Sequence, residues 1–130
     1  MTKNFSLSEF QCKCGCTMPQ DVESNIDKLA TQLQLVRDFV SSPIRINSSY
    51  RCKQHNRSIG SKDTSQHVLG KAADITIDTF TPEEVYQIII NLRSNPFLLG
   101  TYFNGIGRYN TFTHVDIRDT DKLAQWDNRS

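Results

Sequence analysis

The feature that most constrains the fold is a long amphipathic segment from Asp21 to Val40. Apolar residues recur in it at steps of three and four positions, the spacing that places side chains on one face of an α-helix. They are Val22, Ile26, Leu29, Leu33, Val36 and Val40. Ser41-Ser42-Pro43 follows and is typical of a helix end. The segment therefore predicts one long helix with a buried face.

Shorter patterns predict a small α+β domain around this helix. Ser6-Leu7-Ser8-Glu9 and Thr81-Pro82-Glu83-Glu84 both have the form of a capping box. The expected elements are a helical turn from Ser6, a helix over 21–40, a strand over 44–48, a polar loop over 51–66, a strand over 72–77, a helix from 81 to a stop at Asn95-Pro96, and a hairpin of 105–109 with 113–118. The tail from Asp119 is polar apart from Leu123, Ala124 and Trp126. We expect a small antiparallel sheet flanked by helices, in one domain spanning 1–130.

Composition limits the classes of function. The 130 residues fit a single domain, and 15 Lys and Arg balance 14 Asp and Glu to a net charge of +1. Without a basic block, the chain offers no electrostatic reason to bind nucleic acid. No apolar run approaches the ~20 residues of a membrane helix, and the first residues lack the apolar core of a signal peptide. We expect a chain made in the cytoplasm, with no membrane span.

The four cysteines leave several interpretations open. Cys12, Cys14 and Cys16 alternate in Cys-Lys-Cys-Gly-Cys, and Cys52 stands apart. They could form a structural zinc site, a disulfide from the cluster to Cys52, or a set of reduced, partly buried thiols. Zinc ribbons usually use Cys-x2–4-Cys pairs, and the single-residue gaps here depart from that spacing. The spacing therefore favours structural thiols without a metal.

Two predicted strands carry ionisable side chains on one face. In the strand over 72–77, Asp74 lies opposite its apolar neighbours, and a carboxylate there is costly to desolvate without a partner such as a metal or an arginine. In the last strand, His114, Asp116 and Arg118 share a face. If the two strands are neighbours, Asp74 and His114 converge with His67, which directly precedes the first strand.

Such a group has the composition of a catalytic zinc site. Two imidazoles and one carboxylate, with a fourth position open to water, are typical zinc ligands, and zinc suits amide hydrolysis because it acidifies water and polarises a carbonyl. Manganese or iron could occupy the same ligands. The alternative is that these are ordinary surface polar groups, the interpretation that we favour for His55 in its loop or helix start.

Several short segments, in a fixed order along the chain, carry a resemblance to a known family. They are Phe5-Ser6-Leu7-Ser8-Glu9-Phe10 with the cysteine cluster, Ser48-Ser49-Tyr50-Arg51, His55-Asn56, Ser65-Gln66-His67, Gly70-Lys71-Ala72-Ala73-Asp74, Gly105-Ile106-Gly107-Arg108-Tyr109 and Phe112-Thr113-His114-Val115-Asp116. Over roughly residues 4 to 118 the chain resembles the zinc D-alanyl-D-alanine carboxypeptidase family, and more closely its small phage and prophage members, which cut peptidoglycan peptides. The resemblance implies a fold of the hedgehog/D-Ala-D-Ala-peptidase type and a zinc cofactor.

The resemblance also implies a metal-binding role for individual positions. His67 and Asp74 match the His-x6-Asp pair that binds zinc in the family. His114 matches the later histidine that is the third ligand. These are the same three residues that the strand pattern brings together.

Substrate-binding positions follow from the same resemblance. Arg51 matches the arginine of the Ser-x-Tyr-Arg motif, which holds carbonyl or carboxylate oxygens of the substrate. A guanidinium suits that role because it is always charged and donates in a fork. Ser65 and Gln66 are expected to add polar contacts to the substrate.

One departure from the family concerns the catalytic base. Several relatives carry an acid three residues before the last histidine ligand, or a histidine two before it, where this chain has Thr111 and Phe112. The available carboxylate is Asp116, two residues after His114 on the same strand face, and we assign it as the catalytic base. Alternatively, Asp116 is the ligand and His114 the proton carrier, or Asp116 only orients His114 or pairs with Arg118.

The expected function is hydrolysis of amide bonds in peptidoglycan stem peptides or cross-links by an endolysin-like zinc peptidase of phage or prophage origin. Such a protein, expected to be a monomer made in the host cytoplasm, would act at the cell wall after release or from the virion. The alternatives are a non-catalytic zinc-binding module on the same scaffold and a phage tail-associated structural protein. The sequence does not distinguish carboxypeptidase from endopeptidase action, because specificity depends on whether the groove is closed at one end.

Overall fold

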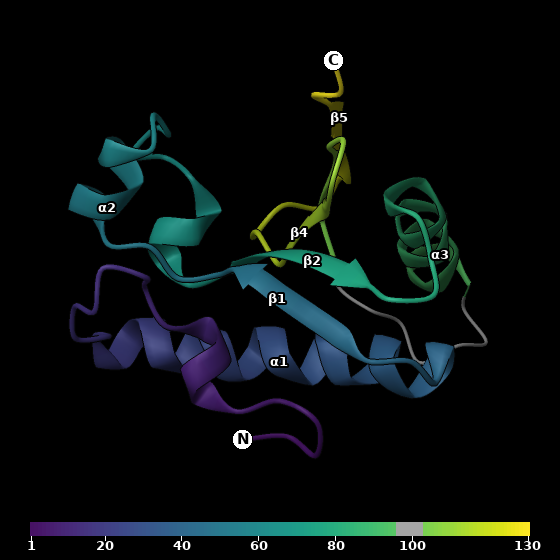
Figure 1. Ribbon diagram of the computed structural model, residues 1–130, viewed down its shortest axis with the longest axis horizontal. Helices are drawn as coiled ribbons and strands as arrows, with labels where there is room; N and C mark the ends of the chain where they lie inside the picture. Colours follow the sequence, from purple (N-terminus) through teal and green to yellow (C-terminus); the bar gives the residue numbers. More distant parts are fainter. Residues whose placement is uncertain (96–102) are drawn as a thin grey trace.

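The computed structural model describes residues 1–95 and 103–130 and is built on a five-stranded sheet of order β1-β2-β4-β3-β5 (Figure 1). Its elements are η1 (Leu7–Phe10), α1 (Gln20–Val40), β1 (Ile44–Ser48), α2 (Lys53–Ser58), η2 (Gln66–Leu69), β2 (Ala72–Ile77), α3 (Pro82–Ser94), β3 (Gly105–Arg108), β4 (Thr113–Asp116) and β5 (Ala124–Asp127). The α+β fold class predicted from the sequence is confirmed. No helix within the two described ranges is long and apolar enough to cross a membrane.

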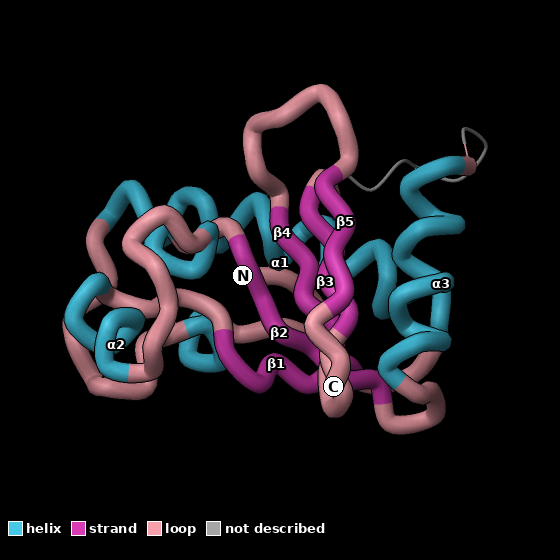
Figure 2. The backbone as a smooth tube through the Cα atoms, turned by 90° about the horizontal axis from the view of Figure 1, so that it is seen from above, coloured by secondary structure: helices cyan, strands magenta, loops and turns pink. Residues whose placement is uncertain are grey.

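The long helix α1 lies along one face of the sheet, below β1 and β2 in Figure 1. The apolar stripe predicted for it is buried, with Ile26, Leu29 and Leu33 fully inaccessible, and it shares one core with Ile75 and Ile77 of β2. Burial of such side chains supplies most of the favourable free energy of folding. Figure 2 shows α2 and α3 at opposite ends of the sheet.

The strand register decides which polar side chains meet. β2 and β4 are antiparallel, and Asp74 lies directly opposite His114. On the other side of β2, the pairing with β1 shifts between Ile46 and Ser48, so that Ser48 also lies opposite Asp74. An irregularity of this kind redirects the chain at the end of a strand. It leads β1 into the segment that carries Arg51.

Two regions differ from the sequence-based prediction. The stretch over 51–66, predicted as a loop, contains the short helix α2, whose first turn is capped because the Cys52 Sγ accepts a hydrogen bond from the His55 N–H. The tail contains β5, which pairs in parallel with β3, so the sheet is mixed rather than wholly antiparallel. The prediction missed this strand because it is only four residues long and one of its faces is exposed. The helix stop predicted at Pro96 lies outside the described residues.

The two glycines Gly60 and Gly70 allow the packing between α1 and the segment before β2 to be tested. Both have left-handed backbone conformations, with φ of 83° and 73°. A Cβ at Gly70 would lie 2.7 Å from the Val22 Cγ1 atom of α1, whereas a Cβ at Gly60 would meet nothing within 4 Å. We expect Gly60→Ala to lower the free energy of unfolding by about 1–2 kcal/mol through backbone strain, and Gly70→Ala to lower it further. Urea unfolding followed by circular dichroism measures the difference, and equal losses would contradict the close packing of Gly70.

Candidate metal centre

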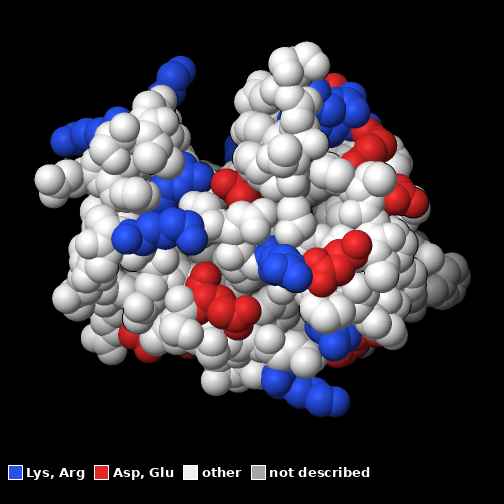
Figure 3. All heavy atoms as spheres, viewed as in Figure 1, with Lys and Arg blue, Asp and Glu red and all other residues white. Residues whose placement is uncertain are grey.

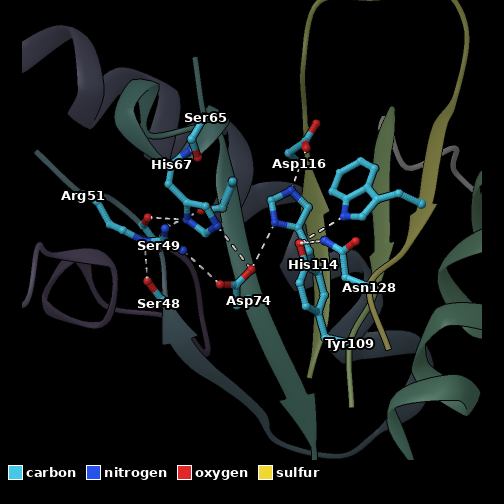
Figure 4. A network of polar contacts seen from close by, with 12 residues as sticks. Ser48, Ser49, Arg51, Ser65, His67, Asp74, Tyr109, His114, Asp116 and Asn128 are labelled. Atoms are coloured by element: carbon cyan, nitrogen blue, oxygen red, sulfur yellow. Dashed lines mark hydrogen bonds and ion pairs between the residues drawn. The ribbon is translucent and has the colours of Figure 1, made fainter. Parts of the chain in front are cut away.

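Three side chains from three different elements converge at one point of the open sheet face (Figure 4). His67 comes from η2, Asp74 from β2 and His114 from β4, and one possible ligand atom of each lies within 4.8 Å of the others. The Oδ1 atom of Asp74 is 3.2 Å from His67 Nε2 and 3.0 Å from His114 Nδ1. The structure therefore brings together the three residues that the sequence predicted as metal ligands.

The outer nitrogen of each imidazole is already bonded. His67 Nδ1 is 2.7 Å from the carbonyl oxygen of Ser49, and His114 Nε2 is 2.7 Å from Asp116 Oδ2. Since both of these partners only accept hydrogen bonds, both outer nitrogens must donate, and in a neutral imidazole the inner nitrogen then carries a lone pair. When both imidazoles are neutral, two lone pairs and the carboxylate of Asp74 therefore face one another, an arrangement suited to a cation between them.

The spacing of these atoms is compatible with a metal ion bound between them. Tetrahedral coordination with bonds of about 2.0–2.1 Å places ligand atoms about 3.3 Å apart, close to the 3.0 and 3.2 Å found here. The partners on the outer nitrogens are those that usually orient histidine ligands, a backbone carbonyl and a carboxylate. His67, Asp74 and His114 could thus hold zinc.

Arg51 completes the surroundings of Asp74. Its Nη2 donates to Asp74 Oδ2 at 3.2 Å, and its other nitrogens donate to Ser48 Oγ at 3.0 Å and Asn56 Oδ1 at 3.1 Å. Burial alone raises the pKa of Asp74, but hydrogen bonds from His114 and His67 outweigh burial and hold the pKa below its usual range. Asp74 is therefore an anion whose two oxygens serve different partners.

Asp116 is the residue for which the structure is most informative. Its side chain is fully buried, and it accepts from Arg118 Nε at 2.8 Å and Nη2 at 2.7 Å in addition to His114. It fits there because Gly105 of β3 has no side chain: a Cβ at that position would lie 2.2 Å from Asp116 Oδ2. Burial raises the pKa of Asp116, but Arg118 and His114 outweigh burial and lower it to about 2. This geometry favours the interpretation that Asp116 orients His114.

The protonation of His114 depends on the same contacts. Burial lowers the pKa of His114, but its hydrogen bonds to Asp116 and Asp74 outweigh burial and raise the pKa above its usual value. Without a metal, the two carboxylates thus favour the protonated form of the imidazole. A metal that binds at Nδ1 must displace that proton.

The three residues lie in a pocket of about 390 Å³, visible in Figure 3 as a hollow between two lobes of the surface. Its wall opposite Arg51 is aromatic: the Trp126 ring lies 5.0 Å from the His114 ring, and Tyr109 stacks on Phe112 at 4.4 Å. Trp126 Nε1 donates to the Tyr109 hydroxyl at 3.1 Å. The sequence analysis missed this wall. The alternation of apolar and polar residues in Ala124-Gln125-Trp126-Asp127 was the signal that could have revealed it.

The remaining predicted site residues have distinct places. Ser65 and Gln66 both line the pocket. Ser65 Oγ accepts from the His67 N–H at 3.2 Å and so caps η2, while the buried Gln66 Oε1 has no hydrogen-bond partner among the described residues. His55 lies elsewhere, in a separate pocket beside Cys14 and Cys16.

Comparison with known proteins places the chain in a family. The family model described as Peptidase M15 matches residues 3–116, most of the chain. The chain therefore belongs to this family, whose peptidases are zinc-dependent, in agreement with the possible metal site of His67, Asp74 and His114. No individual curated protein matches the chain significantly. The match ends before β5, the strand that carries Trp126.

The variant Asp116→Asn tests whether Asp116 orients His114. The amide keeps the shape of the side chain but removes the charge that holds the His114 Nε2–H, so we expect zinc affinity at this site to fall about 10–100-fold. Competition with a chromophoric chelator measures the affinity, and Asp78→Asn, which alters an exposed carboxylate, is the control. Loss of hydrolysis at unchanged zinc affinity would instead support Asp116 as the base.

Proposed function

We propose that this member of the Peptidase M15 family is a metallopeptidase that hydrolyses amide bonds in the stem peptides or cross-links of bacterial peptidoglycan, with His67, Asp74 and His114 as the zinc ligands. The observation that carries the proposal is the pair of imidazole nitrogens aimed at one carboxylate oxygen on the wall of an open pocket. The motif resemblance described above supports peptidoglycan as the substrate and a phage or prophage origin.

Zinc bound by three protein ligands supplies Lewis acidity and lowers the pKa of a coordinated water towards ~7. The protein's own residues hold the three ligands in their metal-binding orientation before the substrate binds. The Ser49 carbonyl fixes the ring of His67, and the Asp116 carboxylate fixes the ring of His114. In this proposal Asp116 is a positioning residue, itself held by Arg118.

Two guanidinium groups line the pocket and suit the oxygens of a peptide. Arg51 is held by Asp74, Ser48 and Asn56, and Arg118 lies over the Trp126 ring at 5.1 Å. Fixed positive charge that faces a carbonyl or carboxylate can bind the substrate and stabilise negative charge that develops during hydrolysis. Ser65 and Gln66 line the same pocket and add polar groups beside the bound peptide.

One observation favours a second candidate, a non-catalytic zinc-binding module on the same scaffold. Asp74 is the only carboxylate among the described residues that line the pocket, and we propose it as a ligand rather than a base. A peptidase of this type needs a group that accepts a proton from water. Hydrolysis therefore has to be measured directly.

Digestion of purified peptidoglycan, followed by mass analysis of the products, separates the two candidates. We expect new amino termini with the zinc-loaded protein, and none after chelation or with His67→Ala, because the ligand set is then incomplete. His55→Ala, which alters a half-buried side chain in a separate pocket, should cleave normally. Loss of a terminal residue would identify a carboxypeptidase, and cut cross-links an endopeptidase. A zinc-loaded wild type that cuts no bond would contradict the peptidase proposal.

Arg51→Lys tests the substrate-binding role of Arg51. Lysine keeps the charge but loses the fork, and we expect kcat/KM to fall about 10–100-fold, the equivalent of one lost charged hydrogen bond. Steady-state kinetics on a soluble muropeptide, at a zinc content shown to be unchanged, measure the effect. Arg57→Lys is the matched control, since Arg57 is an exposed arginine paired with Asp63. Equal kcat/KM in the two variants would restrict Arg51 to a structural role.

A further inference from the structure

We propose that Cys12, Cys14, Cys16 and Cys52 form a second metal site, a structural zinc site separate from the His67-Asp74-His114 centre. All four cysteines lie in the described part of the chain and are free thiols. Their Sγ atoms lie within 4.8 Å of one another. The single-residue gaps had favoured metal-free thiols, and the spatial arrangement favours the metal.

The distances between three of the sulfurs lie close to those of a metal site. Cys14 Sγ is 3.2 Å from Cys12 Sγ and 3.5 Å from Cys52 Sγ, and Cys12 Sγ is 3.9 Å from Cys52 Sγ. A tetrahedral ion with Zn–S bonds of about 2.3 Å holds its sulfurs about 3.8 Å apart. A disulfide joins only two sulfurs, at about 2.05 Å, and leaves the convergence of four unexplained.

A turn explains how such short spacing supplies three ligands. The Gly15 N–H donates to the Cys12 carbonyl at 3.1 Å, and Gly15 has a φ of 81°, a left-handed conformation that glycine adopts readily. The chain therefore reverses between Cys12 and Cys16 instead of running extended, and the alternating cysteines need not point to opposite sides. A zinc knuckle can thus form without the usual two-residue gaps.

The fourth ligand, Cys52, comes from the segment that follows β1. The backbone N–H of Tyr50 donates to the Phe10 carbonyl at 3.0 Å and ties the chain after β1 to the segment before the cluster. Backbone N–H groups also face the sulfurs, with Cys52 N 3.5 Å from Cys12 Sγ and His55 N 3.4 Å from Cys52 Sγ. Donors so placed stabilise the thiolates that bind a metal.

The ligand type and exposure indicate the ion and its purpose. Four thiolates that can surround an ion tetrahedrally favour zinc, a metal of borderline softness. Because protein ligands fill all four positions, no position is left for substrate, as in structural sites. Cys52 directly follows Arg51, whose backbone N–H donates to the His67 carbonyl at 3.1 Å. The second ion would therefore fix the residues that form one wall of the first centre.

Metal counting tests the proposal on the intact chain. Elemental mass spectrometry should find two zinc ions per wild-type chain and one in each of His67→Ala and Cys52→Ser. Cobalt loaded into His67→Ala should give the strong near-ultraviolet band of thiolate-to-cobalt charge transfer. His55→Ala, a change beside the cysteines that removes no proposed ligand and retains the backbone donor, should keep two ions and is the matched control.

Two results would overturn the proposal. One is a His67→Ala protein without bound zinc whose four thiols react freely in the native state. The other is a wild-type mass lower by two hydrogens, which indicates a disulfide. If Cys52→Ser does not fold, cobalt-loaded His67→Ala decides, because it keeps all four cysteines. The count is also independent of peptidase activity, so the two proposals can fail separately.

Discussion

The structure of the pocket depends on one buried carboxylate. Asp74 lies in β2, the second strand from one edge of the sheet, and is buried, so an unpaired negative charge there would be costly. Each neighbouring element supplies a partner: η2 provides His67, β4 provides His114, and the chain after β1 provides Arg51. The strand register, the irregularity in β1 and the cap of η2 all serve to complete this one set of contacts.

Much of this could be predicted from the sequence because it follows from periodicity. The period of α1 and the alternation in β2 and β4 placed Asp74 and His114 on the face away from the core, and the structure pairs them directly. Loop structure could not be predicted in the same way. The helix α2 carries no apolar stripe, and β5 depends on pairing with β3, a partner distant in sequence. Such contacts exist only after the fold has formed.

For Asp116 and for the cysteines, residue spacing alone did not predict the arrangement of the side chains. Alternation placed Asp116 on the same face as His114, but the room left by Gly105 lets its carboxylate lie buried within the sheet rather than at the pocket surface. Similarly, the single-residue gaps between the cysteines favoured thiols without a metal, whereas the turn at Gly15 brings their sulfurs together. In both cases a glycine decides the outcome through the side chain that it lacks.

The pocket has two parts, one within the residues that the family model matches and one formed by β5 beyond them. The possible metal ligands lie within the residues that the family model describes, and Trp126, which forms the opposite wall, lies beyond them. Among the described strands, β5 lies at the edge of the sheet and pairs only with β3. The pairing of β2 with β4, which places Asp74 opposite His114, does not involve β5. The metal ligands and the aromatic wall opposite Arg51 therefore rest on separate strand pairings, so that changes in β5 alter the shape of the pocket without changing the ligand set.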